Sequence, residues 1–185
     1  MVNETIQEHV DKMKKSIELM RKDYAGLRAG RANPSILDKI QVEYYGTPTP
    51  LVQMANIAAP EPRLLTIQPW DKTSISAIEK AILKSDLGLN PSNDGTVIRI
   101  IIPQLTQDRR KELVKVVHKK AEDTRVSVRN IRRDCNDKIK ALEKNKSVTE
   151  DESKKGQDEI QKLTDKYIKE IDHIMDVKEK EIMEV

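Results

Sequence analysis

The chain has 185 residues, of which 35% are charged and only 3% aromatic, and its net charge is +3. This composition disfavours a large β-sheet protein, whose core draws on aromatic and β-branched residues, and favours long amphipathic helices. The single cysteine, Cys135, excludes an intrachain disulfide and a zinc site of the CxxC type. No stretch resembles a signal peptide or a membrane span, so we expect a cytoplasmic protein without a membrane partner.

The first predicted element is a helix over residues 6–27. Its apolar side chains recur at alternating spacings of four and three, which is typical of a helix that packs against other helices. The apolar positions are Ile6, Val10, Met13, Ile17, Met20, Tyr24 and Leu27.

The segment 31–104 has a different character. Ile40, Val42 and Tyr44 alternate in strand period before the turn-forming sequence GTPTP. RLLTIQPW and TVIRIIIP are predicted as further strands, ISAIEKAILKSD as a short helix, and LGLNPSNDG as a turn. Together they predict a small α/β domain of about 75 residues, in which Trp70 and the Tyr44–Tyr45 pair belong to the core and the edge.

Two more helices with the same spacing follow. The second begins near Thr106, which can cap the free amides, and the third begins at a capping box formed by Thr149 and Glu152. The apolar stripe of the second helix includes Val114, Val117, Ala121, Thr124, Val128, Ile131, Cys135, Ile139 and Leu142. The predicted fold class is therefore α+β: a long three-helix bundle, with helices of roughly 28 to 40 residues, and an inserted α/β domain.

The insertion divides the chain into a discontinuous bundle, 1–30 and 105–185, and a domain at 31–104. The chain crosses the boundary twice, near 29–32 and near 103–106. Glycine permits unusual dihedral angles and proline restricts them, so a hinge is predicted there, with a rigid joint as the alternative. The candidate hinge residues are Gly30, Arg31, Pro103, Gln104, Leu105 and Thr106.

Charge is distributed unevenly along the helices. Residues 106–145 contain 13 Lys and Arg against 7 Asp and Glu, whereas residues 149–185 contain 7 against 12. The two helices could pair with each other, or the basic one could provide a field that attracts a polyanion.

The sequence shows no enzymatic signature. Its six glycines form neither a GxGxxG nor a GxxxxGK[ST] phosphate loop. His9, His118 and His173 lack partners at metal-ligand spacing and are expected at the surface. Cys135 lies on an apolar stripe, where a buried thiol is usually inert. We therefore expect no catalytic residue, no metal and no cofactor.

An arginine-rich stripe remains. At 100° per residue, Arg132, Arg125, Asn136 and Arg129 lie together beside the apolar stripe, and Arg133 lies farther round. Arg132 is nearest the apolar stripe, so its stem can rest on apolar surface while the guanidinium points outward. No acid occurs four residues after Arg125 or Arg129, and this uncompensated charge suggests an anionic partner.

Several motifs closely resemble the bacterial ribosome recycling factor family: LRAGRANPSILDKIQVEYYGTPTPL, IEKAILKSDLGLNP, LTQDRRKEL, VRNIRRDCNDKIK and DEIQKLTDKYI. The resemblance implies an L-shaped molecule of tRNA-like size that splits the post-termination ribosome together with elongation factor G, which hydrolyses the GTP. It also implies that Arg129 and Arg132 contact large-subunit ribosomal RNA, and we expect a monomer. The rival interpretations are a helical adaptor, whose stripe pairs with an acidic helix, and a general RNA chaperone.

Overall fold

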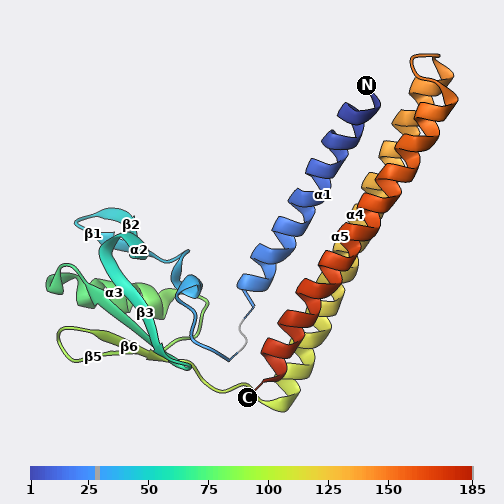
Figure 1. Ribbon diagram of the computed structural model, residues 1–185. Coiled ribbons are helices and arrows are strands. Elements are labelled where there is room, and N and C mark those ends of the chain that lie inside the picture. The colour runs from blue at the N-terminus through green and yellow to red at the C-terminus, as the bar shows by residue number, and fades with distance from the viewer. Residues whose placement is uncertain (28–29, 185) are drawn as a thin grey trace. The chain divides into compact units, whose positions relative to one another are not determined.

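The computed structural model describes residues 1–27 and 30–184, and the chain divides into two compact units. One unit contains Met1–Leu27 and Asp108–Val185, and the other contains Arg28–Gln107. The first unit is built from three helices, α1 (Val2–Ala25), α4 (Gln107–Lys144) and α5 (Glu150–Met183) (Figure 1). No helix in the described ranges combines the length and the apolarity needed to cross a membrane.

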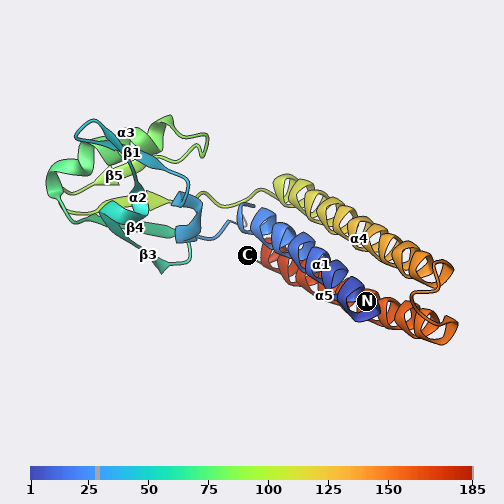
Figure 2. The ribbon, with the colours of Figure 1, turned by 90° about the horizontal axis from the view of Figure 1, so that it is seen from above.

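The three helices pack side by side with alternating polarity (Figures 1 and 2). The helices α1 and α5 run in the same direction. Two contacts show this: Arg21 pairs with Glu170 at 3.2 Å, and farther along both helices the Leu27 carbonyl accepts a hydrogen bond from Lys178. The helix α4 runs the opposite way, so that the Tyr24 hydroxyl of α1 donates to the Val117 carbonyl at 2.7 Å. The bundle predicted from the apolar spacing is confirmed.

The core of the bundle follows the predicted apolar stripes closely on α1 and only in part on α4, where Val114, Thr124, Ile131 and Leu142 are half-buried. On α1 every predicted position from Ile6 to Tyr24 is buried. The helix has 24 residues, fewer than the roughly 28 to 40 expected for the bundle helices; it begins before the predicted residue 6 and ends before Gly26. The buried residues of α4 and α5 include Leu113, Val117, Ala121, Val128, Cys135, Ile139, Gly156, Ile160, Tyr167, Ile171 and Ile182.

The second unit is a small α/β domain with two sheets. Strands β1 (Gln41–Tyr44) and β2 (Thr47–Pro50) form an antiparallel hairpin. The other sheet is antiparallel in the order β3-β4-β6-β5, where β3 is Ala55–Glu61, β4 is Leu64–Pro69, β5 is Pro91–Asn93 and β6 is Ile98–Ile101. The remaining elements are α2 (Leu51–Met54), α3 (Ile75–Lys84) and the short 3-10 turns Pro34–Leu37 and Lys72–Ser74.

The core of this unit lies between α3 and one face of the larger sheet. Ile75, Ile78 and Ile82 of α3 share one buried cluster with Leu65 and Ile67 of β4, and alternate residues of β6 join the same cluster. This alternation is the strand period expected of a sheet that is covered on one side.

Three strands and one helix of this unit were not predicted. The central strands β4 and β6 carry strong apolar alternation and match the prediction, whereas β3 and β5 are edge strands. The prediction that GTPTP only breaks a strand is wrong, because Thr47–Pro50 forms β2 in a two-stranded hairpin. Proline lacks an amide donor but is tolerated where a strand has a neighbour on only one side. The β5 residues, Pro91–Asn93, were likewise predicted as a turn, because proline, serine and asparagine are typical turn residues.

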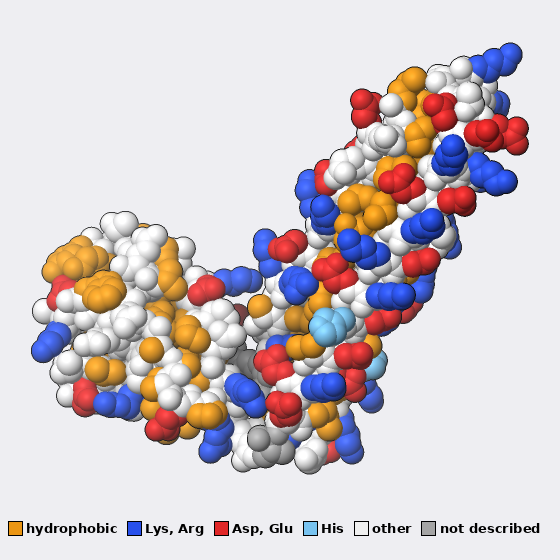
Figure 3. Space-filling model, in the orientation of Figure 1, with side chains coloured by type: hydrophobic (Ala, Val, Ile, Leu, Met, Phe, Trp, Pro, Cys, Tyr) orange, Lys and Arg blue, Asp and Glu red, His pale blue; other side chains and the backbone are white. Residues whose placement is uncertain are grey.

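Two of the aromatic residues are more exposed than predicted. Trp70 and Tyr45 are 71% and 84% exposed, and hydrophobic side chains gather over the β1–β2 side of this unit (Figure 3). Tyr45 and Gly46 both have positive φ and form the two-residue turn of the hairpin. Only Tyr44 is partly buried, and its hydroxyl donates to the Asp71 carboxylate at 3.0 Å.

Candidate nucleic-acid interface

The candidate interface is the arginine stripe of α4. Buried residues of this helix, Val128, Cys135 and Ile139 among them, fix which side of α4 faces the core. The half-buried side chains beside that side are Arg125, Arg129, Arg132 and Asn136, whereas Arg133 is exposed. The positions of these side chains therefore agree with those expected from the sequence at 100° per residue.

Arg132 is held by a neutral side chain of α5. Its Nη1 donates to Gln161 Oε1 at 2.7 Å, and Gln161 Nε2 donates to Asp165 Oδ1 at 3.0 Å. Arg132 Nε is buried and has no hydrogen-bond partner among the described residues. The guanidinium is thus fixed through one nitrogen, while its charge has no carboxylate partner within the described part of the chain.

Arg125 has the opposite environment. Its Nη2 lies 2.6 Å from Asp172 Oδ1 of α5, its Nη1 lies 3.0 Å from Glu122 Oε2, and its side chain is only 16% exposed. Burial by itself would lower the pKa of Arg125, but the hydrogen bonds to Asp172 and Glu122 outweigh it and raise this pKa. Arg125 therefore links α4 to α5 as a compensated charge.

This pairing corrects the expectation of an uncompensated stripe. Glu122 also lies 3.6 Å from Arg129 Nη1, so two of the arginines share one acid. The expectation considered only acids four residues onward along the same helix, whereas Glu122 precedes Arg125 by three residues and Asp172 comes from another helix. The charge asymmetry is partly mutual pairing of α4 and α5.

The outer members of the stripe have weaker contacts. The Arg129 side chain is 42% exposed, and exposed ion pairs at 3.6 Å contribute little to stability. Arg133 Nη1 donates to Asn130 Oδ1 at 3.3 Å, a contact within the same helix turn. Asn136 Oδ1 is buried and unpartnered among the described residues. Arg129, Arg132 and Arg133 can therefore offer donors to an anion without breaking a strong ion pair.

Sequence reasoning missed Gln161 and Asp165. Both are exposed and four residues apart, so their mutual hydrogen bond could be expected from helix geometry. Their position beside Arg132 depends on how α4 and α5 are aligned, and no local sequence signal gives that alignment.

Two further residues that the sequence singled out, Cys135 and His9, are buried. Cys135 is fully buried, and burial raises the pKa of its thiol to about 11, so it stays protonated at neutral pH. His9 was expected at the surface, but it is 1% exposed and its Nδ1 lies 2.7 Å from the Thr5 carbonyl oxygen, because this helix face packs on the bundle. Residues 1–27 and 30–184 contain no cluster of His, Cys, Asp and Glu that could hold a metal.

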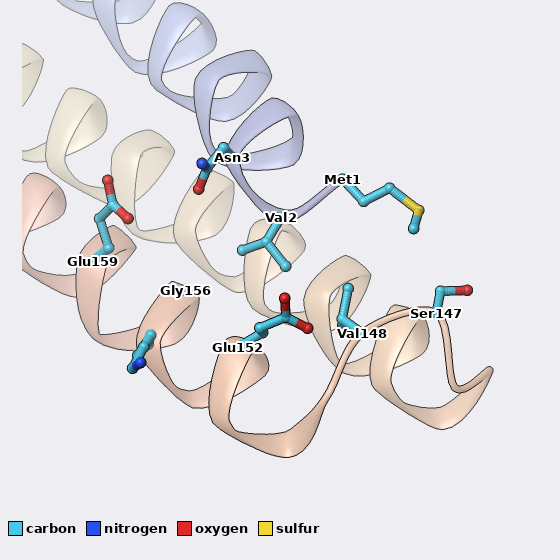
Figure 4. A pocket seen from close by; sticks show the side chains of 9 residues that line it. Met1, Val2, Asn3, Ser147, Val148, Glu152, Gly156 and Glu159 are labelled. Atoms are coloured by element: carbon cyan, nitrogen blue, oxygen red, sulfur yellow. The ribbon is translucent and has the colours of Figure 1, made fainter.

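A hollow of about 420 Å³ lies at the end of the bundle where α1 begins (Figure 4). It is lined by Val2, Asn3, Val148, Glu152 and Gly156 among others, and the Glu152 carboxylate points into it. That carboxylate already accepts a hydrogen bond from the Thr149 backbone amide at 2.8 Å, as part of the capping box that begins α5.

The predicted hinge positions lie at the two connections between the units. Gly30 has φ +74°, and a Cβ at this position would lie 3.2 Å from Leu105 Cγ, so the two connecting segments touch here. Leu105 is half-buried, while Arg31, Pro103, Gln104 and Thr106 are exposed. Position 29, also within the predicted hinge, lies outside the described residues.

Comparisons with known proteins identify the family. The ribosome recycling factor family model matches residues 20–183. The ribosome-recycling factors of Desulforamulus reducens and Syntrophomonas wolfei are 66% and 64% identical to the chain over 185 residues, covering 100% of both proteins in each case.

Solved structures give the same answer. A solution structure of the ribosome recycling factor matches with a TM-score of 0.80 at 44% identity, covering 100% of this chain and 98% of that one. Another structure contains models of the T. thermophilus ribosome recycling factor and the E. coli elongation factor G bound to the E. coli post-termination complex. It matches with a TM-score of 0.67 at 49% identity, covering 100% of both chains. The sequence, the bundle with its inserted domain and these matches agree, and the chain belongs to the ribosome recycling factor family.

Proposed function

We propose that this chain disassembles the post-termination ribosome, acting with elongation factor G to separate the subunits. The observation that carries the proposal is similarity over the full length: relatives named ribosome-recycling factor cover 100% of the chain. A 49% identical neighbour was solved together with elongation factor G on a post-termination complex, which supports the same partners here.

The proposed contact with large-subunit ribosomal RNA is the arginine stripe of α4. Arg132 and Arg129 are its main members, because one is fixed by a neutral amide and the other has only a long, exposed ion pair. Planar guanidinium groups suit phosphate and base edges, where they can donate two hydrogen bonds at once. Arg133 and Asn136 extend the surface, and Arg125 shapes it by joining α4 to α5.

In the proposed mechanism, the two units of the ribosome-bound chain have different roles. The bundle, 1–30 and 105–185, anchors on the RNA, and the domain at 31–104 receives the force that elongation factor G generates from GTP. The positive φ of Gly30 supports a hinge there, since glycine adopts this backbone conformation readily. The chain itself is proposed to be a non-enzymatic cytoplasmic monomer.

A subunit-splitting assay tests this function. Post-termination ribosomes are followed by light scattering after addition of the chain, elongation factor G and GTP, each alone and together. The proposal predicts a loss of scattering only with all three. Binding should be tighter to large subunits than to bulk ribosomal RNA at the same salt concentration. Equal affinity for both, without splitting, would identify an RNA chaperone, and no RNA-dependent binding would identify a protein adaptor.

A further inference from the structure

The Gln161 amide connects two side chains of opposite character. Its oxygen accepts from Arg132 Nη1 at 2.7 Å, and its nitrogen donates to Asp165 at 3.0 Å. An amide rotated by 180° would place its NH₂ group against a guanidinium and its oxygen against a carboxylate, two repulsive contacts. Asp165 therefore fixes the orientation in which Gln161 can hold Arg132.

Arg132 contacts a neutral amide of α5, whereas Arg125 contacts a carboxylate. Both arginines lie on the same face of α4, and both contact α5. Arg125 meets the Asp172 carboxylate at 2.6 Å, which cancels much of its charge. Arg132 meets only an amide oxygen, so it is restrained while its full charge remains available to an anion.

We propose that Gln161 and Asp165 are positioning residues for RNA recognition: Asp165 orients the Gln161 amide, and Gln161 preorganises the Arg132 guanidinium without neutralising it. This inference rests on the proposed contact between Arg132 and ribosomal RNA. A free arginine side chain loses conformational entropy when it binds, and a side chain that is already held loses less.

A double-mutant cycle tests the inference. Affinity for large subunits is measured for Gln161→Ala, Arg132→Ala and the double variant. Gln161→Ala should weaken binding about 3- to 10-fold, the loss expected when one flexible side chain must be ordered on binding. In the Arg132→Ala background the same change should have no effect, because Gln161 acts only through Arg132.

Salt dependence separates positioning from direct contact. Arg132→Ala removes a phosphate contact and should lower the log–log salt slope by about one unit. Gln161→Ala removes no charge and should leave the slope unchanged. Gln161→Glu keeps the acceptor but adds a carboxylate beside Arg132, and it should weaken binding and lower the slope. Asp165→Asn should weaken binding less than Gln161→Ala, since the amide can then adopt either orientation.

The chain provides a matched control. Gln7 and Asp11 form the same pair on α1, with Gln7 Nε2 donating to Asp11 Oδ1 at 2.9 Å and no arginine hydrogen-bonded to Gln7 within the described residues. Gln7→Ala should leave ribosome affinity unchanged, and thermal melts of all variants should match the parent. Two outcomes would refute the positioning role but leave the Arg132 contact standing. In one, Gln161→Ala weakens ribosome binding equally in the parent and in the Arg132→Ala background. In the other, Arg132→Ala weakens binding and Gln161→Ala does not. If Arg132→Ala binds normally, the RNA contact fails and the positioning role fails with it.

Discussion

Arg125 and Arg132 lie two turns apart on α4 and differ in what holds them. Two carboxylates contact Arg125, and one amide contacts Arg132. A guanidinium between carboxylates joins helices together, whereas one held by a neutral group keeps its charge for a ligand. We therefore expect two residues of the same type on the same face to have separate tasks, Arg125 in stability and Arg132 in binding.

We expect Arg125→Ala to destabilise the bundle by about 1–2 kcal/mol, because it removes charge-assisted hydrogen bonds between α4 and α5. The loss stays moderate because the Asp172 side chain is 46% exposed and water can solvate it. Chemical denaturation measures the free energy of unfolding. Arg133→Ala removes the same charge from an exposed site and serves as the control. Equal stability of the two variants would show that Arg125 does not link the helices.

The Glu8 carboxylate joins α1 to α4 in a pH-dependent way. It lies 2.9 Å from Lys12 Nζ and 3.2 Å from Lys138 Nζ. The hydrogen bond from Lys12, and then that from Lys138, lower the pKa of Glu8 to about 2. A lowered pKa in the folded state means that the ionised group stabilises the fold above its unfolded pKa, and that this contribution disappears as pH falls toward 2.

Glu8→Gln should therefore be less stable than the parent near neutral pH, and the difference should vanish as pH falls through the folded pKa. Thermal melts at a series of pH values measure it. Glu18→Gln is the control, since Glu18 is on the same helix and has no ion pair within the described part of the chain. A difference that persists unchanged to low pH would contradict the assignment.

Among the three bundle helices, α1 and α5 approach each other most closely, and Gly156 permits this. A Cβ at position 156 would lie 2.5 Å from Val2 Cγ1 and 3.3 Å from Ile139 Cδ1. Glycine within a helix is destabilising by about 1 kcal/mol relative to alanine, so its presence in α5 needs a packing reason. The reason is the first turn of α1, which rests on this position (Figure 4).

Gly156→Ala should lower stability by about 1–2 kcal/mol, because overpacking outweighs the gain in helix propensity. In a Val2→Ala background the methyl group that clashes is gone, and the same substitution should become neutral or stabilising. Thermal melts of the four variants measure this change of sign. A stabilising effect of Gly156→Ala in the parent would show that the first turn of α1 is not held against α5.

The elements show which features sequence can predict. The stripe from Ile6 to Tyr24 and the central strands β4 and β6 carry strong local periodicity, so they were predicted. The edge strands β2, β3 and β5 have contacts on one side only and weak patterns, so they were missed. The helical angle of 100° per residue correctly placed Arg132 beside the core and Arg133 outside it. Gln161 and Asp172 could not be assigned as arginine partners, because pairing between antiparallel helices depends on tertiary alignment.

The whole molecule consists of two units that are joined by two chain crossings, so the bundle should fold alone. Leu27 contacts Lys178, and Arg110 contacts the Met183 carbonyl, five residues later on α5. Residue 27 and the start of α4 therefore lie at the same end of the bundle, beside the last turns of α5, where a short linker can join them.

Residues 1–27 joined to 107–185 by a short Gly-Ser linker should give a helical protein that unfolds cooperatively. Circular dichroism and denaturation measure this. The shortened chain should bind large subunits, because the arginine stripe is intact, but should not split ribosomes with elongation factor G. The full-length chain is the control. An unfolded product would show that the bundle depends on the inserted domain.

The central claim is that an oriented arginine on α4 contacts ribosomal RNA, and one comparison tests it most directly. Large-subunit affinity is measured for Arg132→Ala and Arg133→Ala over a series of salt concentrations, with thermal melts of both. These neighbours carry the same charge, but Arg132 is held beside the core and Arg133 is exposed. We expect Arg132→Ala to weaken binding by about 1–3 kcal/mol and lower the salt slope by about one unit, with little change in melting temperature. Arg133→Ala should do much less, and equal binding losses would contradict the claim by showing that only a diffuse positive field attracts the RNA.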